Sequence, residues 1–325
     1  MSKPKNNPPQ TVVAEAISQL ASDNISGAAE ILGRAAAVFT LLDDRTPEHT
    51  EDFELTQKTV LETCLALARA QPDMTPLLRM ANAALSAARR ESDVRGSLRC
   101  AAEAAQNFVA NAELGAREAA LNTSVIIRDA ATILTHSRSS TVLNAFVEAR
   151  RTGRAFSVVA TESRPMCEGR VLAATLAGHN IPVTLVSDAG ASLAMGAVDL
   201  VIVGADKVTP ANLINKIGTR MIALAARERG LPLYAVFDSS KFICEECSGL
   251  AILQRERRPE ELWRDAPGGV SVINRYFEPT PLGLFTGIIT EDGSLSISEA
   301  ALCAAQTSID GALMETLGSP QDGIK

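Results

Sequence analysis

Charged and amide side chains follow the short apolar runs in the second half of the chain. Asp206 comes soon after the run at 200–203, and Asn215 and Lys216 lie a few residues further on. Arg164 follows an earlier run and offers a planar fork that matches a phosphate or a carboxylate. A carboxylate can donate or accept a proton, cations neutralise an anion, and asparagine hydrogen-bonds hydroxyl groups. These residue types together are typical of a site for a phosphorylated small polyol.

Each of these side chains also has a purely structural interpretation. Asp206 could pair with Lys207 or Lys216, or it could cap a turn. We expect Lys216 in the first turn of a helix, where the helix dipole disfavours a cation, so that it needs an anion as partner. Arg164 precedes Pro165 and could be a solvated turn residue. The sequence alone leaves both interpretations open.

Other polar residues near the expected strand ends are equally ambiguous. Residues 135–141 are polar and open a helix near Ser140, where free amide groups could hold a phosphate. Asp188 could line the site or serve as a plain N-cap for the segment that begins at Ser192. Cys167 is more often a small filler beside a helix start than a nucleophile.

The elements that would position these side chains are short β-rich runs alternating with helical segments after about residue 130. The expected strands are 132–134, 156–160, 183–186, 200–203 and 233–237, and the expected helices are 140–151, 168–178 and 215–229. Apolar strands separated by helices indicate a parallel sheet covered on both faces. In such sheets ligands bind beyond the carboxyl ends of the strands. We therefore predict an α/β fold with a Rossmann-like domain and a mainly parallel sheet.

The first part of the chain has a different composition. It contains only three aromatic residues before residue 130 and is rich in alanine, leucine, glutamate and arginine, which favour helices. Apolar residues recur there every three to four positions. Thr75 is expected to cap a helix with Pro76 at its first position. The sequence thus predicts an N-terminal helical domain at 1–128 and the Rossmann-like domain at 129–325.

Composition and charge exclude several classes of protein. With 325 residues the chain is long enough for about two domains with a large core. The net charge is −7 and there is no basic run, which argues against nucleic acid or an anionic membrane as partner. No apolar stretch approaches a membrane span, and the polar start lacks the apolar core of a signal peptide. We expect a cytoplasmic protein.

The sequence motifs of common cofactor and metal sites are missing. There is no Gly-x-Gly-x-x-Gly after a strand and no Gly-x-x-x-x-Gly-Lys-Ser/Thr loop, which argues against dehydrogenases and kinases. Only Cys244 and Cys247 have metal-like or redox-like spacing, and a zinc site would need a second ligand pair. His136 and Ser137 with Asp206 have the residue types of a hydrolytic triad, but no Gly-x-Ser-x-Gly elbow exists. We expect no metal and no cofactor.

Several motifs together resemble one protein superfamily. They are TESRPMCEGR at 161–170, NIPVT at 180–184, VGAD at 203–206 and NKIGT at 215–219, with further likeness at 25–29, 33–37, 277–281 and 288–291. The superfamily joins the regulatory alpha, beta and delta subunits of translation initiation factor 2B, methylthioribose-1-phosphate isomerase and ribose-1,5-bisphosphate isomerase. Lys241-Phe242 looks more like the initiation-factor alpha and ribose-bisphosphate branches.

The resemblance implies a helical N-terminal domain, a Rossmann-like C-terminal domain that dimerises, and a sugar-phosphate pocket between them. In the isomerase branches a cysteine and an aspartate convert an aldose to a ketose without metal or cofactor. The aspartate corresponds to Asp206, and the phosphate and hydroxyl contacts correspond to Asn215 and Lys216. The Arg-Gly-Ala contact of the ribose-bisphosphate branch falls on Gly27 and Ala28, preceded here by serine.

The chain departs from the isomerase pattern at several positions. Ser137 stands where the isomerases have the catalytic cysteine, and a hydroxyl is far harder to ionise than a thiol. Ser26 and Gln71 replace two arginines that contact phosphate. Arg138 offers a replacement charge. The spacing from the aspartate to the Asn-Lys pair is one residue short, with Pro210 in the loop.

Two functions remain. The first is an intramolecular oxidoreductase, an aldose–ketose isomerase acting on a 1-phosphorylated pentose with Asp206 and either Ser137 or an unidentified base. The second is a non-catalytic regulator like initiation factor 2B alpha, which senses a sugar phosphate or nucleoside monophosphate and binds partner subunits. We favour the first because Asp206, Asn215 and Lys216 are retained. A homodimer or higher homo-oligomer is expected in either case.

Overall fold

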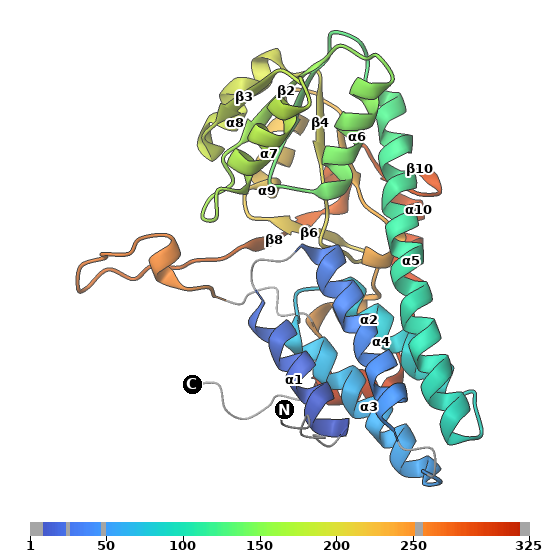
Figure 1. The fold of residues 1–325 in the computed structure, drawn as a ribbon. Helices are drawn as coiled ribbons and strands as arrows, with labels where there is room; N and C mark the ends of the chain where they lie inside the picture. Colours follow the sequence, from blue (N-terminus) through green and yellow to red (C-terminus); the bar gives the residue numbers. More distant parts are fainter. Residues whose placement is uncertain (1–8, 24–26, 47–49, 251–255, 319–325) are drawn as a thin grey trace, which may run out of the picture. The chain divides into compact units, whose positions relative to one another are not determined.

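The computed structural model describes residues 9–23, 27–46, 50–250 and 256–318. The chain divides into two compact units, drawn in Figure 1. The helical unit contains Met1–Glu113, Gly249–Ala251 and Ser308–Lys325, and the sheet unit contains Leu114–Ser248 and Ile252–Thr307. The division falls inside one long helix, α5 (Val94–Ile126).

The helical unit is built from helices with buried apolar stripes. They are α1 (Pro9–Ser22), α2 (Ala28–Arg45), α3 (Phe53–Ala70), α4 (Thr75–Ala88), the first part of α5, and α11 (Gly311–Gly318). Phe39, Leu67 and Leu77, from three of these helices, are almost fully buried. The predicted N-terminal helical region is confirmed. The predicted Thr75 cap is wrong: Met74 is the N-cap, and the Thr75 hydroxyl, already inside the helix, is buried with no hydrogen-bond partner among the described residues.

The sheet unit contains a seven-stranded sheet in the order β10-β9-β7-β4-β1-β2-β3. The strands are β1 (Thr132–Thr135), β2 (Ser157–Thr161), β3 (Val183–Val186), β4 (Leu200–Val203), β7 (Leu233–Val236), β9 (Gly287–Thr290) and β10 (Gly293–Leu295). All pairs are parallel except β9 with β10. The chain adds strands outward from β1 on one side and from β4 on the other, so the strand order reverses between β1 and β4.

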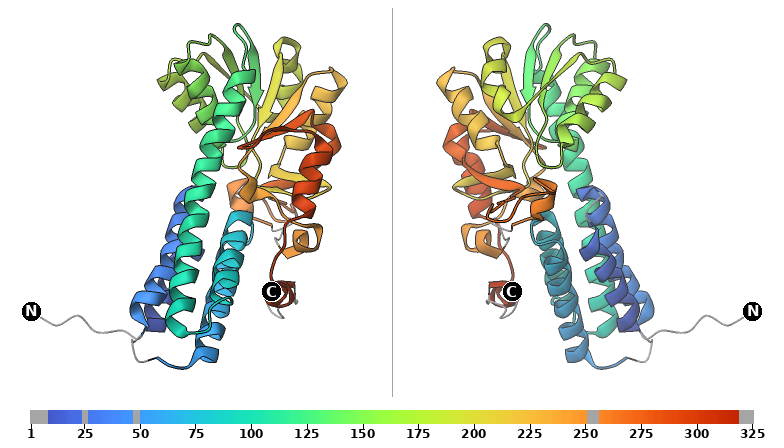
Figure 2. Two further views of the ribbon diagram at one scale, coloured as in Figure 1. Left: turned by 90° about the vertical axis from the view of Figure 1, so that its right-hand side faces the viewer. Right: turned by 90° about the vertical axis from the view of Figure 1, so that its left-hand side faces the viewer.

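Helices cover both faces of this sheet. They are α6 (Ser140–Arg151), α7 (Glu168–Gly178), the short α8 (Ala191–Ala194), α9 (Thr219–Glu228) and α10 (Ile297–Ala305). Along β4, Val201 and Val203 enter the core shared with α9 and α10, whereas Ile202 enters the core shared with α6 and α7. Figure 2 shows α6 and α10 on opposite sides of the sheet. The predicted α/β fold with a mainly parallel sheet is confirmed.

A second, smaller sheet follows β4 and corrects one prediction. It consists of β5 (Lys207–Val208), β6 (Asn212–Lys216) and β8 (Phe277–Pro281), all antiparallel. Asn215 and Lys216 therefore lie on a strand, and not in the first turn of a helix. The helix begins only at Thr219, after Gly218 with a φ of 106°. The physical reason is the pairing of β6 with β8, which supplies backbone partners that a local pattern does not reveal.

Two features are absent from the described residues. Among the helices within them, none combines the length and the apolar composition that a membrane span requires. In the same part of the chain, no cluster of three or more histidine, cysteine, aspartate or glutamate side chains is placed to bind a metal ion.

Candidate functional site

The loops after β1 and β4 meet at the point where the strand order reverses. Ser137 lies in the first loop and Asp206 in the second, and both are partly buried. A methyl group added to Gly204 would lie 2.6 Å from the Cβ of Ser139, so the two loops are in direct contact. In open parallel sheets the crevice outside such a reversal is where ligands bind. The structure therefore brings the predicted catalytic pair to the favoured edge of the sheet.

A lysine also approaches the loop that carries Asp206. Lys241 follows β7, and its Nζ donates a hydrogen bond to the carbonyl oxygen of Ala205 at 2.6 Å. The Lys241 ammonium group therefore lies beside Ala205, the residue that precedes Asp206. Our residue-level prediction of the site did not include Lys241, although Lys241-Phe242 was part of the family resemblance.

The loop between β2 and α7 is fixed by a carboxylate from the next strand. Asp188 follows β3, and its two oxygens accept hydrogen bonds from the backbone amides of Ser163 and Arg164 at 2.7 and 2.8 Å. Asp188 thus fixes this loop. The Arg164 guanidinium is exposed, donates to the Leu262 carbonyl at 3.3 Å and lies 3.9 Å from the Cys167 sulfur. Arg138 is exposed as well.

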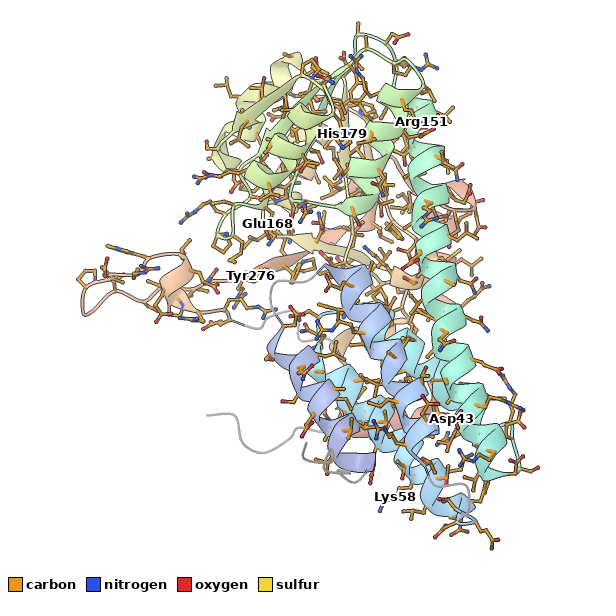
Figure 3. All side chains as sticks on the ribbon, in the orientation of Figure 1. Asp43, Lys58, Arg151, Glu168, His179 and Tyr276 are labelled. Carbon is orange, nitrogen blue, oxygen red and sulfur yellow. The ribbon has the colours of Figure 1, made fainter. Side chains whose placement is uncertain are left out.

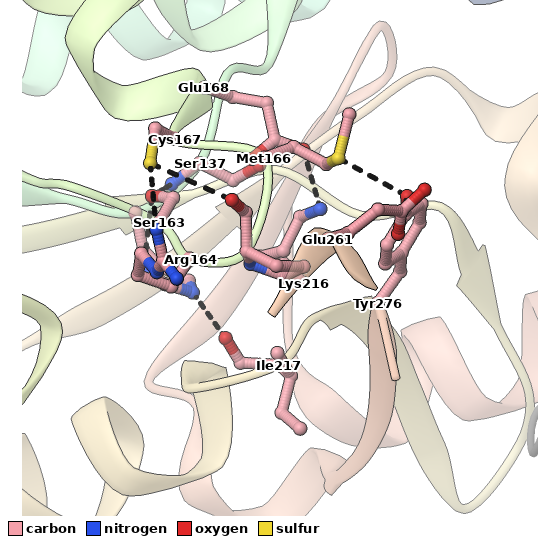
Figure 4. Close-up of polar contacts among 12 residues, drawn as sticks. Ser137, Ser163, Arg164, Met166, Cys167, Glu168, Lys216, Ile217, Glu261 and Tyr276 are labelled. Carbon is pink, nitrogen blue, oxygen red and sulfur yellow. Dashed lines mark hydrogen bonds and ion pairs between the residues drawn. The ribbon is translucent and has the colours of Figure 1, made fainter. Parts of the chain in front are cut away.

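Lys216 is almost fully buried and has its anion partner within the chain. Its Nζ lies 2.5 Å from Oε1 of Glu168, the first residue of α7 (Figure 4). Figure 3 labels Glu168 on the sheet unit. The ammonium group also lies over the rings of Tyr276 and Phe277, 4.8 and 5.6 Å from their centroids. The second Glu168 oxygen is buried with no hydrogen-bond partner among the described residues. Lys216 thus has an anion partner 48 residues away in the sequence, but burial on a strand, and not the predicted place in the first turn of a helix, is what makes the partner necessary.

Asn215 and the start of α9 form a second hydrogen-bonded cluster. The Asn215 side-chain amide donates to the Thr219 hydroxyl at 3.1 Å, and that hydroxyl donates to the Lys216 carbonyl at 2.6 Å. Glu278 on β8 accepts from the backbone amides of Gly218 and Arg220, at 2.7 and 2.9 Å. A carboxylate at a helix N-terminus satisfies free amides and the dipole. Asn215 and Lys216 are thus held by the hydrogen bonds to Thr219, and the backbone that follows them is held by those to Glu278.

His136, considered from the sequence only as a member of a hydrolytic triad, is a residue of this region that the predicted isomerase site did not include. It is 1% exposed, and its ring nitrogens contact the Thr161 hydroxyl at 2.6 Å and the Ile217 carbonyl at 2.8 Å. Burial, which disfavours the charged form, lowers the pKa of His136 below its usual value. In the sequence, the buried contacts of His136 are indicated only by its place directly after a buried strand.

Gly27 and Ala28, predicted to bind substrate, belong to the helical unit. Gly27 is the N-cap of α2, in an extended conformation, and Ala28 is the first residue of that helix. The Gly27 carbonyl accepts from the Ile31 amide at 3.1 Å. Ser26, the residue before them, lies outside the described residues. Gln71, which replaces an expected arginine, donates to the carbonyls of Leu20 and Asp23 at 2.8 and 2.9 Å.

The arrangement in the sheet unit combines a carboxylate, a hydroxyl and several cations along one edge. Asp206 and Ser137 can exchange protons with a ligand, and Lys241, Lys216 and Arg164 can offset negative charge. The Cys244 and Cys247 thiols lie close together, 2.8 Å between sulfurs, in a buried position. Burial raises the pKa of Cys247 to about 12, which disfavours a nucleophilic thiolate there.

Comparisons with known proteins agree with the motifs. Residues 24–297 match the model of the Initiation factor 2 subunit family. A ribose 1,5-bisphosphate isomerase of Archaeoglobus fulgidus is 32% identical over 291 residues, which cover 87% of this chain and 89% of that protein. A methylthioribose-1-phosphate isomerase of Heliobacterium modesticaldum is 41% identical over 185 residues, 52% of this chain and 54% of that protein. A solved structure of the Pyrococcus horikoshii translation initiation factor eIF-2B has a TM-score of 0.72 and 29% identity, covering 87% of this chain and 96% of that one.

Proposed function

The chain belongs to the Initiation factor 2 subunit family, and on that basis we propose that it is a metal-free aldose–ketose isomerase acting on a 1-phosphorylated pentose. The observation that carries the proposal is the position of Asp206 and Ser137 on touching loops at the reversal of strand order. One relative that matches most of both chains, from Archaeoglobus fulgidus, is a ribose 1,5-bisphosphate isomerase. A pentose with a phosphate at C1 is therefore the substrate class we favour.

In the proposed reaction Asp206 is the acid. A protonated Asp206 donates to the ring oxygen of the sugar, so the ring opens and C1 becomes electron-poor. Hydrogen then moves from C2 to C1 with its electron pair, and the C2 hydroxyl gives up its proton as the ketone forms. Ser137, or another base beside it, accepts that proton. One proton is gained and one is lost, so the reaction needs no external oxidant or reductant.

The remaining residues would bind the substrate. Lys216 and Arg164 would offset phosphate charge and Asn215 would hydrogen-bond hydroxyl groups, with Arg138 as an additional exposed cation. Gly27 and Ala28 remain substrate-binding proposals on the basis of the family resemblance. Because Lys216 is paired with Glu168, a bound phosphate has to share or displace that carboxylate. We also propose a homodimer.

The alternative is a non-catalytic regulator of the initiation factor 2B type. The serine at position 137 favours this alternative, because a hydroxyl is a poor replacement for a catalytic thiol. The likeness to the Pyrococcus horikoshii factor favours it as well. A regulator would bind phosphorylated sugars or nucleoside monophosphates without turnover and would associate stoichiometrically with translation initiation components.

An assay of 1-phosphorylated pentoses, followed by proton NMR for the ketose, tests the proposal. We expect turnover by the wild-type chain, none by Asp206→Asn, and ligand binding by both. Turnover that survives Asp206→Asn would remove Asp206 as the acid. A wild-type chain that binds these sugars, converts none and retains initiation components in a pull-down would support the regulator.

Thermal denaturation tests the binding residues separately. A phosphorylated pentose should raise the melting temperature of the wild-type chain and raise that of Lys216→Ala much less. Lys58→Ala, an exposed lysine on α3, is the matched control and should respond like the wild type. Equal responses of all three proteins would place the ligand elsewhere.

A further inference from the structure

A buried chain of hydrogen bonds connects three loops of the sheet unit through one histidine. The Nδ1 of His136 contacts the Thr161 hydroxyl at the end of β2, and its Nε2 contacts the carbonyl of Ile217, next to Lys216. The Ile217 contact is drawn in Figure 4. The ring thus touches the loop before α9 directly.

The Ile217 carbonyl determines which ring nitrogen carries a proton. A carbonyl oxygen only accepts hydrogen bonds, so the Nε2 of His136 must carry a proton toward Ile217. Nδ1 is then free to accept from the Thr161 hydroxyl. A proton on Nδ1 as well would be accepted by that hydroxyl, which would then donate to Ser163 instead. The Ile217 contact therefore fixes the proton on Nε2, and burial of the ring favours the neutral form in which Nδ1 accepts.

The chain of hydrogen bonds continues back to the residue beside His136. The Ser137 amide donates to the Ser163 hydroxyl at 2.8 Å. Because Thr161 gives its proton to His136, the Ser163 hydroxyl donates to Thr161, whose hydroxyl and carbonyl oxygens lie 3.1 and 3.2 Å away. All donors therefore point the same way, from Ser137 through Ser163, Thr161 and His136 to Ile217.

The loops held by this chain need outside support. Ser137 and Ser163 have φ angles of 66° and 64°, a left-handed region that is unfavourable for residues other than glycine. On the other side of the ring, a Cβ at Gly218 would lie 3.1 Å from two ring atoms of His136. The imidazole is thus packed against one loop and connected to the strained pair through the Thr161 hydroxyl.

We propose that His136 is a positioning residue which, as the neutral Nε2–H imidazole, holds the Ser137 loop and the Lys216 loop in a single fixed arrangement. The inference rests on the proposed function, because these loops carry a candidate catalytic group and a candidate binding group. It adds a residue that acts through both of them without touching the substrate.

The charges around His136 determine how firmly the neutral form is held. Asp188 after β3 and Glu278 on β8 favour protonation of the ring, whereas Lys216 on β6 and burial oppose it. Burial is the largest of these influences, so the pKa of His136 is lowered overall. The ring should therefore remain neutral at pH 7.

NMR of the chain with nitrogen-15 labelled histidine tests the protonation without any assay of activity. The chain has three histidines, so the signals of His136 can be assigned by comparison with His136→Gln. We expect the Nε2–H form in the wild type and in Thr161→Ser, and a shifted Nδ1 signal in Thr161→Val, which lacks the hydroxyl. An Nδ1–H form, or a charged ring at pH 7, would overturn the proposal.

Kinetics of four variants test the positioning role. Ser163→Ala removes the hydroxyl that accepts from Ser137 and donates to Thr161, but it leaves the contacts of His136 with Thr161 and Ile217 in place. The value of kcat should therefore fall about tenfold, the order expected for a lost buried hydrogen bond, with the affinity for inorganic phosphate unchanged. His136→Phe should lower both kcat and phosphate affinity. Thr161→Ser should keep both kcat and phosphate affinity within about twofold of the wild type. Thr161→Val is less disruptive than His136→Phe and should lower both quantities, as His136→Phe does.

The outcomes separate this inference from the proposed function. Parallel losses in Ser163→Ala and His136→Phe, or no loss in either, would overturn the positioning role. If the wild type neither binds nor converts any phosphorylated pentose, the proposed function fails. In that case the tautomer and the amide shift of Ser137 in Ser163→Ala still decide whether the hydrogen-bond chain exists.

Discussion

The buried ion pair of Lys216 and Glu168 determines how the site responds to anions. Lys216 has 5% of its side chain exposed and Glu168 has 29%, so water does little to stabilise either charge alone. Removing one partner of such a pair is more costly than the net value of the pair, because the other charge stays buried. The pair therefore both stabilises the loop and competes with a ligand phosphate.

We predict that Glu168→Gln lowers stability but increases affinity for inorganic phosphate. The free energy of unfolding should fall by about 1–3 kcal/mol, less than for a fully buried pair because Glu168 is partly exposed. Urea denaturation and phosphate titration measure the two effects. Glu162→Gln, which breaks a more exposed pair with Arg170, is the control, with a change of about 0–1 kcal/mol. Weaker phosphate binding by Glu168→Gln would contradict the prediction.

The stability of the folded chain should depend on pH through His136. Its pKa is lowered by burial from 6.5, so below pH 6.5 the unfolded chain binds a proton that the folded chain does not. The free energy of unfolding therefore decreases as the pH falls through 6.5, and this contribution is fully present above it. Urea denaturation between pH 8 and 5 should show a smaller slope for His136→Gln than for the wild type. His179→Gln, at an exposed position, should retain the wild-type slope.

At the level of elements, the parallel strands and their crossover helices were largely predictable. Each has a continuous apolar run or a helical period of its own, and 183–186, 200–203, 140–151 and 168–178 are found with the predicted bounds. The strands of the small sheet were not predicted. Asn215 pairs with Glu278, 63 positions later, and no local pattern encodes such a pairing.

The site was predictable to the same extent. Ser137, Arg164 and Asp206 follow parallel strands, so topology alone brings them to one edge. The contact of Lys216 with Glu168 depends on how β6 lies against the start of α7, and the role of His136 depends on two partners from other elements. Strand ends can be located from the sequence, but side-chain partners across elements cannot.

The close packing of α7 on β2 predicts contrasting effects of two alanine substitutions in one helix. A Cβ at Gly169 would overlap the carbonyl oxygen of Thr161 and lie 3.0 Å from that of Glu162, so Gly169→Ala should lower stability by about 3 kcal/mol or more. Gly178 has open space around it, and Gly178→Ala should be neutral or stabilising by up to about 1 kcal/mol. Thermal and urea denaturation compare them. Similar losses in both variants would contradict the close contact.

At the level of the whole molecule, the last described segment completes the first unit. The Asn82 side chain donates to the Ser308 carbonyl at 3.1 Å and accepts from the Asp310 amide at 2.7 Å. Arg89 forms an ion pair with Asp310, and α11 packs on α3. No motif in the sequence predicts this return of the chain to the helical unit, because the contacts join residues more than 200 positions apart.

Hydrogen exchange should reveal this link as a unit-specific effect. Asn82→Ala should increase exchange in α3 and α4 and leave the seven-stranded sheet unchanged, because both of its hydrogen bonds lie in the helical unit. Asn122→Ala is the matched control. Its side chain donates to the carbonyls of Thr290 and Glu291 at 2.9 and 3.0 Å, so its effect should be confined to the region of β9. Equal effects of both variants on both units would contradict this division.

The return of α11 has a consequence for the order of events at the ribosome. The helices α1–α4 acquire α11 as a neighbour only after residues 311–318 emerge. At about 5–20 residues per second, the nascent helical unit spends on the order of 10 s or more with the α11-facing surface of α3 uncovered. The sheet unit, which ends at Thr307, is fully emerged before that surface is covered. A chaperone that recognises apolar helix surfaces would thus bind its target before residues 311–318 emerge and lose it once α11 has packed on α3.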